Sequence, residues 1–243
     1  MSGARSPLNR PDPALAALES AALSARVAPA VLDTRRARLT RIFQIGFNKC
    51  GTRSLYRFFQ RSNIAAAHFN RGLLAERLAE NLATGRKPLA GPIDRYVAYT
   101  DIQHVTQARV LEGGTFFRAL YHYYPLSYFI LNTRDKAGWI ASRLRHGDGA
   151  YARRYGRGLG LATEAEVVAR WSEDWDRHHA EVMAFFADKP GRLLVFDIKQ
   201  DSAERLVAFL APDFVTRAAD FRHEGDSAAV DAETYRRNVP VRR

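Results

Sequence analysis

A polar turn in the first half of the chain carries residues of the types that bind phosphate or sulfate. The turn follows a short apolar run that stops at Gly46, carries Lys49 and Gly51, and leads into a helical pattern that begins near Arg53. The first N–H groups of a helix lack backbone partners, and the helix dipole is positive at that end. Together with an ammonium group they attract an anion. The turn therefore predicts a binding site for a phosphate or sulfate group.

The order of residues in this turn differs from that of the phosphate-binding loop of nucleoside triphosphatases. That loop, G-x-x-x-x-G-K-[ST], places its lysine directly after the second glycine. Here Lys49 lies two residues before Gly51, and the sequence shows no acidic cluster suited to magnesium. A nucleotide kinase or another P-loop-type phosphotransferase is therefore an alternative rather than the preferred interpretation.

A second strand-turn-helix segment lies later in the chain. Tyr128–Leu131 predicts a buried strand, Arg134 follows its end, and Ser142 lies eight residues after the arginine. A guanidinium group forms paired hydrogen bonds with phosphate, a geometry that lysine does not offer. Trp139, between the two, is expected to pack between helix and sheet rather than to stack on a base. The segment therefore predicts a second phosphate-binding group at a strand end.

The two segments together resemble the sulfotransferase family, and the resemblance covers roughly residues 40–212. A strand-and-helix unit that begins at Leu193 supports it. The resemblance implies a P-loop-like sulfotransferase fold, with 3′-phosphoadenosine-5′-phosphosulfate as the sulfate donor and co-substrate. It also implies that Lys49 stabilises charge on the leaving phosphate, and that Arg134 and Ser142 bind the 3′-phosphate of the donor.

The same resemblance assigns the other donor-binding residues to the turn and the helix start. These residues are Lys49, Cys50, Gly51, Thr52, Arg53 and Ser54. Family loops commonly carry Thr or Ser where this chain has Arg53, so its guanidinium either adds charge beside the 5′-phosphate or points to solvent. Cys50 is expected to be a small packed residue, because sulfuryl transfer requires no thiolate.

A general base is expected after the third strand, because the acceptor hydroxyl must lose a proton as the sulfuryl group moves. Cytosolic steroid and phenol sulfotransferases carry a Thr-His-Leu-Pro stretch with a catalytic histidine at this place. In the stretch Tyr99–His104, Asp101 aligns with that histidine. A carboxylate can accept the proton when burial or a neighbouring charge sets its pKa suitably. His104 is the competing candidate, and the sequence leaves the choice open.

Alternating strand and helix patterns position these residues. The predicted strands are residues 42–45, 64–68, 96–100, 128–131 and 193–196. Their alternation with helical patterns favours an α/β fold, in which a parallel sheet of about five strands is flanked by helices and ligands bind at the carboxyl ends of the strands. Residues 1–38 are expected to form an extension with one helix, and residues 39–243 the sulfotransferase domain. The stretch Gly156–Gly160 predicts a flexible loop on the acceptor side.

Composition narrows the class of protein. The chain has 243 residues, of which 47% are hydrophobic and 26% charged, values typical of a soluble globular domain. Its net charge of +11 indicates anionic partners. The basic residues are dispersed, so a polyanionic donor is favoured over nucleic acid. A nonenzymatic basic nucleic-acid-binding protein is the alternative from another class.

The same composition bears on compartment, metal and acceptor. No apolar run reaches the ~18 residues of a membrane span, and Cys50 is the single cysteine, so a cytoplasmic protein is expected, with association at a membrane surface left open. No metal is expected, because Asp, Glu and His residues show no ligand spacing. The acceptor is expected to bear a hydroxyl group: a carbohydrate or glycolipid first, a small phenol or alcohol next. The acceptor's identity and the oligomeric state do not follow from the sequence.

Overall fold

A computed structural model describes residues 40–224, so the helix expected within residues 1–38 lies outside the described part of the chain. The strands are β1 (Ile42–Gln44), β2 (Ala66–His68), β3 (Ala98–Thr100), β4 (Gln103–Val105), β5 (Val110–Glu112), β6 (Tyr128–Thr133) and β7 (Leu193–Asp197). The α-helices are α2 (Thr52–Arg61), α3 (Leu73–Ala83), α4 (Phe117–Tyr123), α5 (Lys136–Arg145), α6 (Ala150–Leu159), α7 (Glu164–Phe186) and α8 (Ala203–Leu210). Short 3₁₀ helices are η2 (Asn70–Gly72), η3 (Pro92–Arg95), η4 (Gly113–Phe116) and η5 (Ala218–Asp220).

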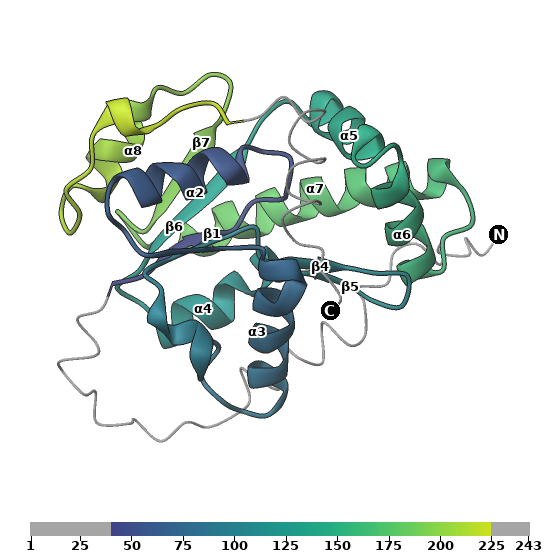
Figure 1. Ribbon diagram of the computed structural model, residues 1–243, viewed down its shortest axis with the longest axis horizontal. Helices are drawn as coiled ribbons and strands as arrows, with labels where there is room; N and C mark the ends of the chain where they lie inside the picture. Colours follow the sequence, from purple (N-terminus) through teal and green to yellow (C-terminus); the bar gives the residue numbers. More distant parts are fainter. Residues whose placement is uncertain (1–39, 225–243) are drawn as a thin grey trace, which may run out of the picture.

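Five parallel strands form the central sheet in the order β2-β3-β1-β6-β7 (Figure 1). β1 lies between β3 and β6, with Ile42 opposite both Ala98 and Tyr128. The chain runs outward from β1 to β2, returns through β3, and then passes to the other side of β1 to form β6. Such a change of direction opens a crevice at the carboxyl ends of the strands. The segments that follow β1, β3 and β6 therefore meet at one edge of the sheet.

Helices cover both faces of this sheet. Ile42 and Ile130 face the apolar sides of α2 and α8, whereas Phe43 and Phe129 face α3, α4 and the second half of α7. Figure 1 shows α2 and α8 on one side of the strands and α3 and α4 on the other. Because successive side chains of a strand point to opposite faces, a strand that is buried on both faces must be apolar at almost every position.

A third apolar cluster joins α5, α6 and the first half of α7 beyond the carboxyl end of the sheet (Figure 1). Its largest members are Trp139, Trp171 and Trp175, of which the first two are fully buried. The start of α7 is fixed by a capping box, in which Thr163 Oγ1 accepts a hydrogen bond from the Glu166 N–H and the Glu166 carboxylate accepts one from the Thr163 N–H. The 23-residue α7 packs against this cluster with its first half and against the core between the sheet, α3 and α4 with its second half. It therefore connects the two clusters.

The predicted α/β class and the five-stranded parallel sheet are confirmed. The predicted flexible loop at Gly156–Gly160 is wrong, because Gly156 lies inside α6 and Gly160 is the C-cap of that helix with φ of 70°. The reason is tertiary packing: Tyr151 and Tyr155 bury their rings in the aromatic cluster, which outweighs the low helix propensity of glycine. The antiparallel pair of β4 and β5 was not expected either.

Candidate functional site

The loop between β1 and α2 is held in one shape by close approaches to neighbouring strands. A Cβ on Gly46 would lie 2.1 Å from the carbonyl oxygen of Asn132, so no larger residue fits there. Gly51 has φ of +75°, and its Cβ would lie 2.4 Å from the side chain of Ile198. Lys49 also has a positive φ, of 64°, a conformation that costs a non-glycine residue of order 1–3 kcal/mol. The surrounding structure therefore maintains the backbone conformation of Lys49.

Buried amide side chains connect this loop to the ends of β3 and β6. Asn132 Nδ2 donates to the carbonyl oxygens of Phe47 at 3.2 Å and Cys50 at 2.9 Å. Gln44 Nε2 donates to Asn132 Oδ1, while Gln44 Oε1 accepts from the backbone N–H of Asp101 at 2.7 Å. The hydrogen bonds run in one direction, from Asp101 to the loop. Three strand ends that carry predicted site residues are thus joined to one another.

A cavity of about 460 Å³ lies at the edge where these strands end. The predicted site residues that line it are Lys49, Gly51, Thr52, Arg53, Ser54, Asp101, Arg134 and Ser142. Its volume falls within the range of about 300–1,000 Å³ that is common for small-ligand sites. Residues of the two sequence motifs, more than 80 positions apart in the chain, therefore face a single space.

The ionic side chains at this cavity are mainly cationic. The cations are Lys49, Arg53, Arg134 and Lys199, and the carboxylates are Asp101 and Glu224. Within residues 40–224, no group of three or more His, Cys, Asp or Glu side chains is arranged to hold a metal ion. Lysine and arginine side chains supply positive charge that would attract an anionic ligand here. Over the same described span, no helix combines the length and apolar character needed to cross a membrane.

Arg134 presents an unused hydrogen-bond donor at the cavity. Its side chain is 20% exposed, and its Nε lies 3.5 Å from Asp135 Oδ1 without hydrogen-bond geometry. Among residues 40–224, no partner satisfies this buried Nε. Arg134 Nη2 donates to Asp135 Oδ1 at 3.5 Å, and Asp135 also caps α5 by accepting from the Gly138 N–H at 2.6 Å. A buried donor without a partner costs about 1–3 kcal/mol. An anion that accepts from Arg134 removes this cost, so the arrangement fits a phosphate group.

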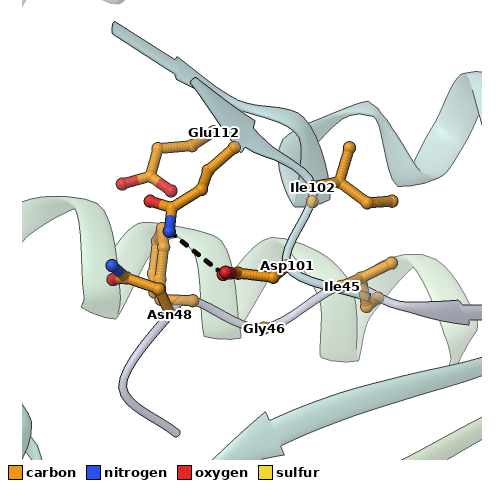
Figure 2. Close-up of a pocket in the computed structure, with 9 residues that line it drawn as sticks. Ile45, Gly46, Asn48, Asp101, Ile102 and Glu112 are labelled. Atoms are coloured by element: carbon orange, nitrogen blue, oxygen red, sulfur yellow. Dashed lines mark hydrogen bonds between the residues drawn. The ribbon is translucent and has the colours of Figure 1, made fainter. Parts of the chain in front are cut away.

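Asp101 lies at the inner wall of the cavity, directly after β3. Its side chain is 12% exposed, and its backbone has a positive φ of 53°. Gln103 Nε2 donates to Asp101 Oδ1 at 3.0 Å, as Figure 2 shows. Burial raises the pKa of the Asp101 carboxyl to about 6, and the nearby His146 and Arg143 offset this only in part. A carboxylate with this pKa is suited to accept a proton from a hydroxyl group near neutral pH.

A second buried carboxylate, Glu112, lies behind Asp101. Between them is a space of about 10 Å³, lined also by Gly46 and Asn48, which is about the room that one water molecule needs (Figure 2). Glu112 is paired with Arg143 at 2.7 Å. The negative charge of Glu112 is therefore compensated by its own partner, and of these two carboxylates Asp101 is the one that lines the large cavity.

Arg143 is a supporting residue that the sequence analysis did not identify. Its side chain is 1% exposed, and its Nε donates to Asn48 Oδ1 at 2.7 Å. Its guanidinium carbon lies 4.5–5.7 Å from the centres of five aromatic rings: Phe47, Trp139, Tyr151, Tyr155 and Trp171. Trp139 Nε1 donates to the carbonyl oxygen of Asn48 at 3.0 Å. Arg143 and Trp139 together hold the residue that precedes Lys49, and Trp139 packs as expected.

Two predicted site residues have side chains outside the cavity lining. His104 lies on β4, and its Nε2 is 3.5 Å from Glu76 Oε1 on α3. Because neighbouring strand residues face opposite sides, Gln103 points toward Asp101 and His104 points away from it. Cys50 is fully buried, and burial raises the pKa of its thiol. The Cys50 thiol is therefore a packed group.

The cavity also contains side chains that the sequence analysis did not select. The ionisable ones are His68, His146, Lys199, His223 and Glu224. The Glu224 N–H donates to Ser54 Oγ at 2.9 Å, and the Glu224 carboxylate pairs with Arg61. No local pattern marks most of these residues, because they come from four separate segments of the chain. His68 is the exception, since it ends a predicted strand, and the carboxyl end of a strand was the signal used for Asp101.

In a comparison with known protein families, the part of the chain that contributes most of the cavity lining matches one family. Residues 41–151 match the family model of the sulfotransferase domain. The matched segment begins at β1, includes the loop before α2, Asp101 and Arg134, and ends at the start of α6. None of the curated proteins compared with the chain matches it.

Proposed function

We propose that the chain is a sulfotransferase, because its residues 41–151 match the sulfotransferase domain, and from this premise we propose its donor, acceptor and site residues. The donor is 3′-phosphoadenosine-5′-phosphosulfate, and the acceptor is a hydroxyl group of a carbohydrate, a glycolipid or a small molecule. Residues 39–243 form the proposed catalytic domain. One observation carries the proposal: the loop after β1, Asp101 after β3 and Arg134 after β6 line one cavity.

The proposed donor site has two parts. Backbone N–H groups at the start of α2, with Thr52 and Ser54, bind the 5′-phosphate, which the positive end of the helix dipole attracts. Arg134 and Ser142 bind the 3′-phosphate, and the unmatched Nε of Arg134 is the donor for which this ligand supplies an acceptor. Lys49 stabilises the charge that grows on the leaving phosphate as the sulfur–oxygen bond breaks.

The proposed acceptor site is formed around Asp101. Its carboxylate takes the proton of the attacking hydroxyl group while the hydroxyl oxygen bonds to sulfur. The burial that raises its pKa to about 6 makes it a stronger base than an exposed carboxylate. His104 is the weaker candidate for this role, because it contacts Glu76 on the opposite side of β4.

The donor assignment is tested by nucleotide binding. Adenosine 3′,5′-bisphosphate is expected to bind at least about tenfold more tightly than AMP or ATP, since a charge-assisted hydrogen bond to the 3′-phosphate contributes about 1.5–3 kcal/mol. Isothermal titration calorimetry measures the three dissociation constants at one salt concentration. Equal affinity for ATP and the bisphosphate would contradict the assignment. Binding of DNA or RNA with a steep salt dependence, and no bisphosphate binding, would favour a nucleic-acid-binding protein instead.

Replacement of Arg134 tests the 3′-phosphate site. Arg134→Lys keeps the charge and loses the paired donor geometry, so the affinity for the bisphosphate is expected to fall about tenfold or more, with little change for AMP. The matched control is Arg77→Lys, because Arg77 is an exposed residue of α3 paired with Glu80. If Arg134→Lys and the control bind the bisphosphate equally well, Arg134 does not contact the donor.

A further inference from the structure

His68 ends β2 and lies at the wall of the cavity beside Asp101. Its side chain is 20% exposed, and its ring is stacked on the ring of Tyr56 from α2, with centroids 4.9 Å apart. Burial, together with the charges of Arg53 and Arg57, lowers the pKa of His68 to about 3. The imidazole is therefore neutral near physiological pH, so one of its nitrogens carries a hydrogen and the other carries a lone pair.

The contacts around His68 favour one position for the hydrogen of its imidazole. The Thr100 hydroxyl donates its single hydrogen to the carbonyl oxygen of Ala67 at 2.9 Å. Thr100 Oγ1 also lies 3.0 Å from His68 Nδ1, and with its hydrogen directed to Ala67 it accepts in this contact. The hydrogen is therefore on Nδ1, and Nε2 has a lone pair available for a ligand.

His68 Nε2 and Asp101 Oδ2 lie 3.9 Å apart. The other Asp101 oxygen already accepts from Gln103 Nε2. Within residues 40–224, no hydrogen bond of a protein donor reaches either Nε2 or Oδ2. Two lone-pair groups that face each other in a partly buried site need hydrogen-bond donors between them. The pair is therefore suited to a ligand that brings two donors.

The backbone at both residues supports a functional role for this pair. Asp101 has a positive φ, and so do the three residues that follow His68, namely Phe69, Asn70 and Arg71, with φ of 51°, 49° and 56°. Such conformations are costly for non-glycine residues and tend to occur at ligand sites, where the surrounding structure maintains them. Phe69 remains tied to β3, because its N–H donates to the carbonyl oxygen of Thr100 at 3.2 Å.

We propose that His68 and Asp101 bind two adjacent hydroxyl groups of the acceptor, so that the preferred acceptor is a vicinal diol. This inference rests on the proposed function. Asp101 Oδ2 accepts from the hydroxyl that attacks, and His68 Nε2 accepts from its neighbour. A lone hydroxyl has one hydrogen and would leave the other acceptor facing an oxygen lone pair. Adjacent hydroxyl oxygens of a diol in the gauche conformation are about as far apart as two hydrogen-bonded oxygens, ~2.8 Å, which suits two acceptors 3.9 Å apart.

In the proposed transfer step, the oxygen of the first hydroxyl forms a bond to sulfur while the bond between sulfur and the bridging oxygen of the donor breaks. The electron pair of the broken bond leaves with the bisphosphate, and the hydroxyl proton moves to Asp101 Oδ2. His68 keeps its single proton on Nδ1 throughout, so its contribution is to select and orient the acceptor.

The choice of acceptor tests this inference. The probes are cis-cyclohexane-1,2-diol, cis-2-methoxycyclohexanol, cyclohexanol and cyclohexylamine, each supplied with the sulfate donor. We expect kcat/KM for the diol to exceed that for the ether and for cyclohexanol about tenfold, the effect of one hydrogen bond. In His68→Asn the amide nitrogen can replace Nδ1 beside Thr100 while Nε2 is absent, so the diol-to-ether ratio should fall to about one. The control His122→Asn changes an exposed histidine of α4 and should keep the wild-type ratio.

A second measurement does not depend on turnover. Nitrogen-15 NMR of the labelled protein, saturated with adenosine 3′,5′-bisphosphate, is expected to show a neutral His68 with its hydrogen on Nδ1, and the Nε2 signal should move on addition of the diol but not of the ether. A hydrogen on Nε2, an unmoved Nε2 signal, equal use of diol and ether, or a preference for cyclohexylamine would each overturn the diol proposal. Loss of bisphosphate binding itself would instead contradict the proposed function, so the two failures are distinguishable.

Discussion

Replacing Lys49 with alanine is expected to lower kcat for sulfuryl transfer about 10²–10³-fold, the effect of removing one group that stabilises developing charge. Donor affinity should fall much less, because the leaving phosphate gains most of its extra charge in the transition state. The substitution should not change the backbone strain at residue 49, because alanine and lysine both carry a Cβ at this positive φ. Steady-state kinetics, with bisphosphate binding measured separately, gives both quantities.

A matched control for this prediction is Lys136→Ala. Lys136 is ion-paired with Asp176 outside the cavity lining, so its loss removes one positive charge without removing a site residue. If Lys49→Ala weakens donor binding as much as it slows turnover, Lys49 serves ground-state binding and not the transition state. If both variants behave alike, only the overall charge of the protein matters.

Replacing Asp101 with asparagine is expected to reduce kcat about 10²–10⁴-fold, the usual contribution of a general base, with bisphosphate binding nearly unchanged. A pH profile provides the second readout. Because the pKa of Asp101 is raised to about 6, the carboxylate is protonated and inactive below this value. The wild-type kcat/KM should therefore rise as pH increases through about 6 and then level off. In Asp101→Asn this rise of kcat/KM with pH should be absent.

His104→Asn is the comparison that separates the two candidate bases. Its effect should be mild, because His104 contacts Glu76 outside the cavity lining. A severe loss in His104→Asn together with normal turnover in Asp101→Asn would assign the base to the histidine. Mild effects in both variants would mean that the acceptor hydroxyl is acidic enough to react without a base, which points to a phenol.

The features that sequence predicted are those encoded within one continuous segment. The turn around Lys49 and the unit that carries Arg134 each consist of a strand, a turn and a helix start, so their local patterns place the functional side chains at a strand end. The alternation of such units also predicts the parallel sheet. That Asp101 follows a strand end is likewise a local property, and the sheet order then brings the three segments together.

The features that sequence did not predict depend on contacts between distant segments. Arg143 looks like a surface residue of a helix until α6 and α7 surround it with aromatic rings. The lone pair of His68 depends on Thr100, 32 positions away, and on where that hydroxyl sends its hydrogen. The side chain of His104 lies outside the cavity lining, because the pairing of β4 with β5 directs it toward Glu76. Such roles arise only after the chain has folded.

The one-way series of amides through Gln44 and Asn132 has a consequence for how the two substrates communicate. Each amide is oriented by the one before it, since turning either would set two oxygens or two NH₂ groups face to face. The loop of the proposed donor site and the backbone of Asp101 are therefore members of one rigid frame. In the proposed site, a donor bound to N–H groups of this loop would hold the carbonyl of Cys50 and, through Asn132 and Gln44, the N–H of Asp101 in one arrangement. Occupancy of the proposed donor half would thus keep the proposed acceptor half ordered, which favours an order in which the donor enters first.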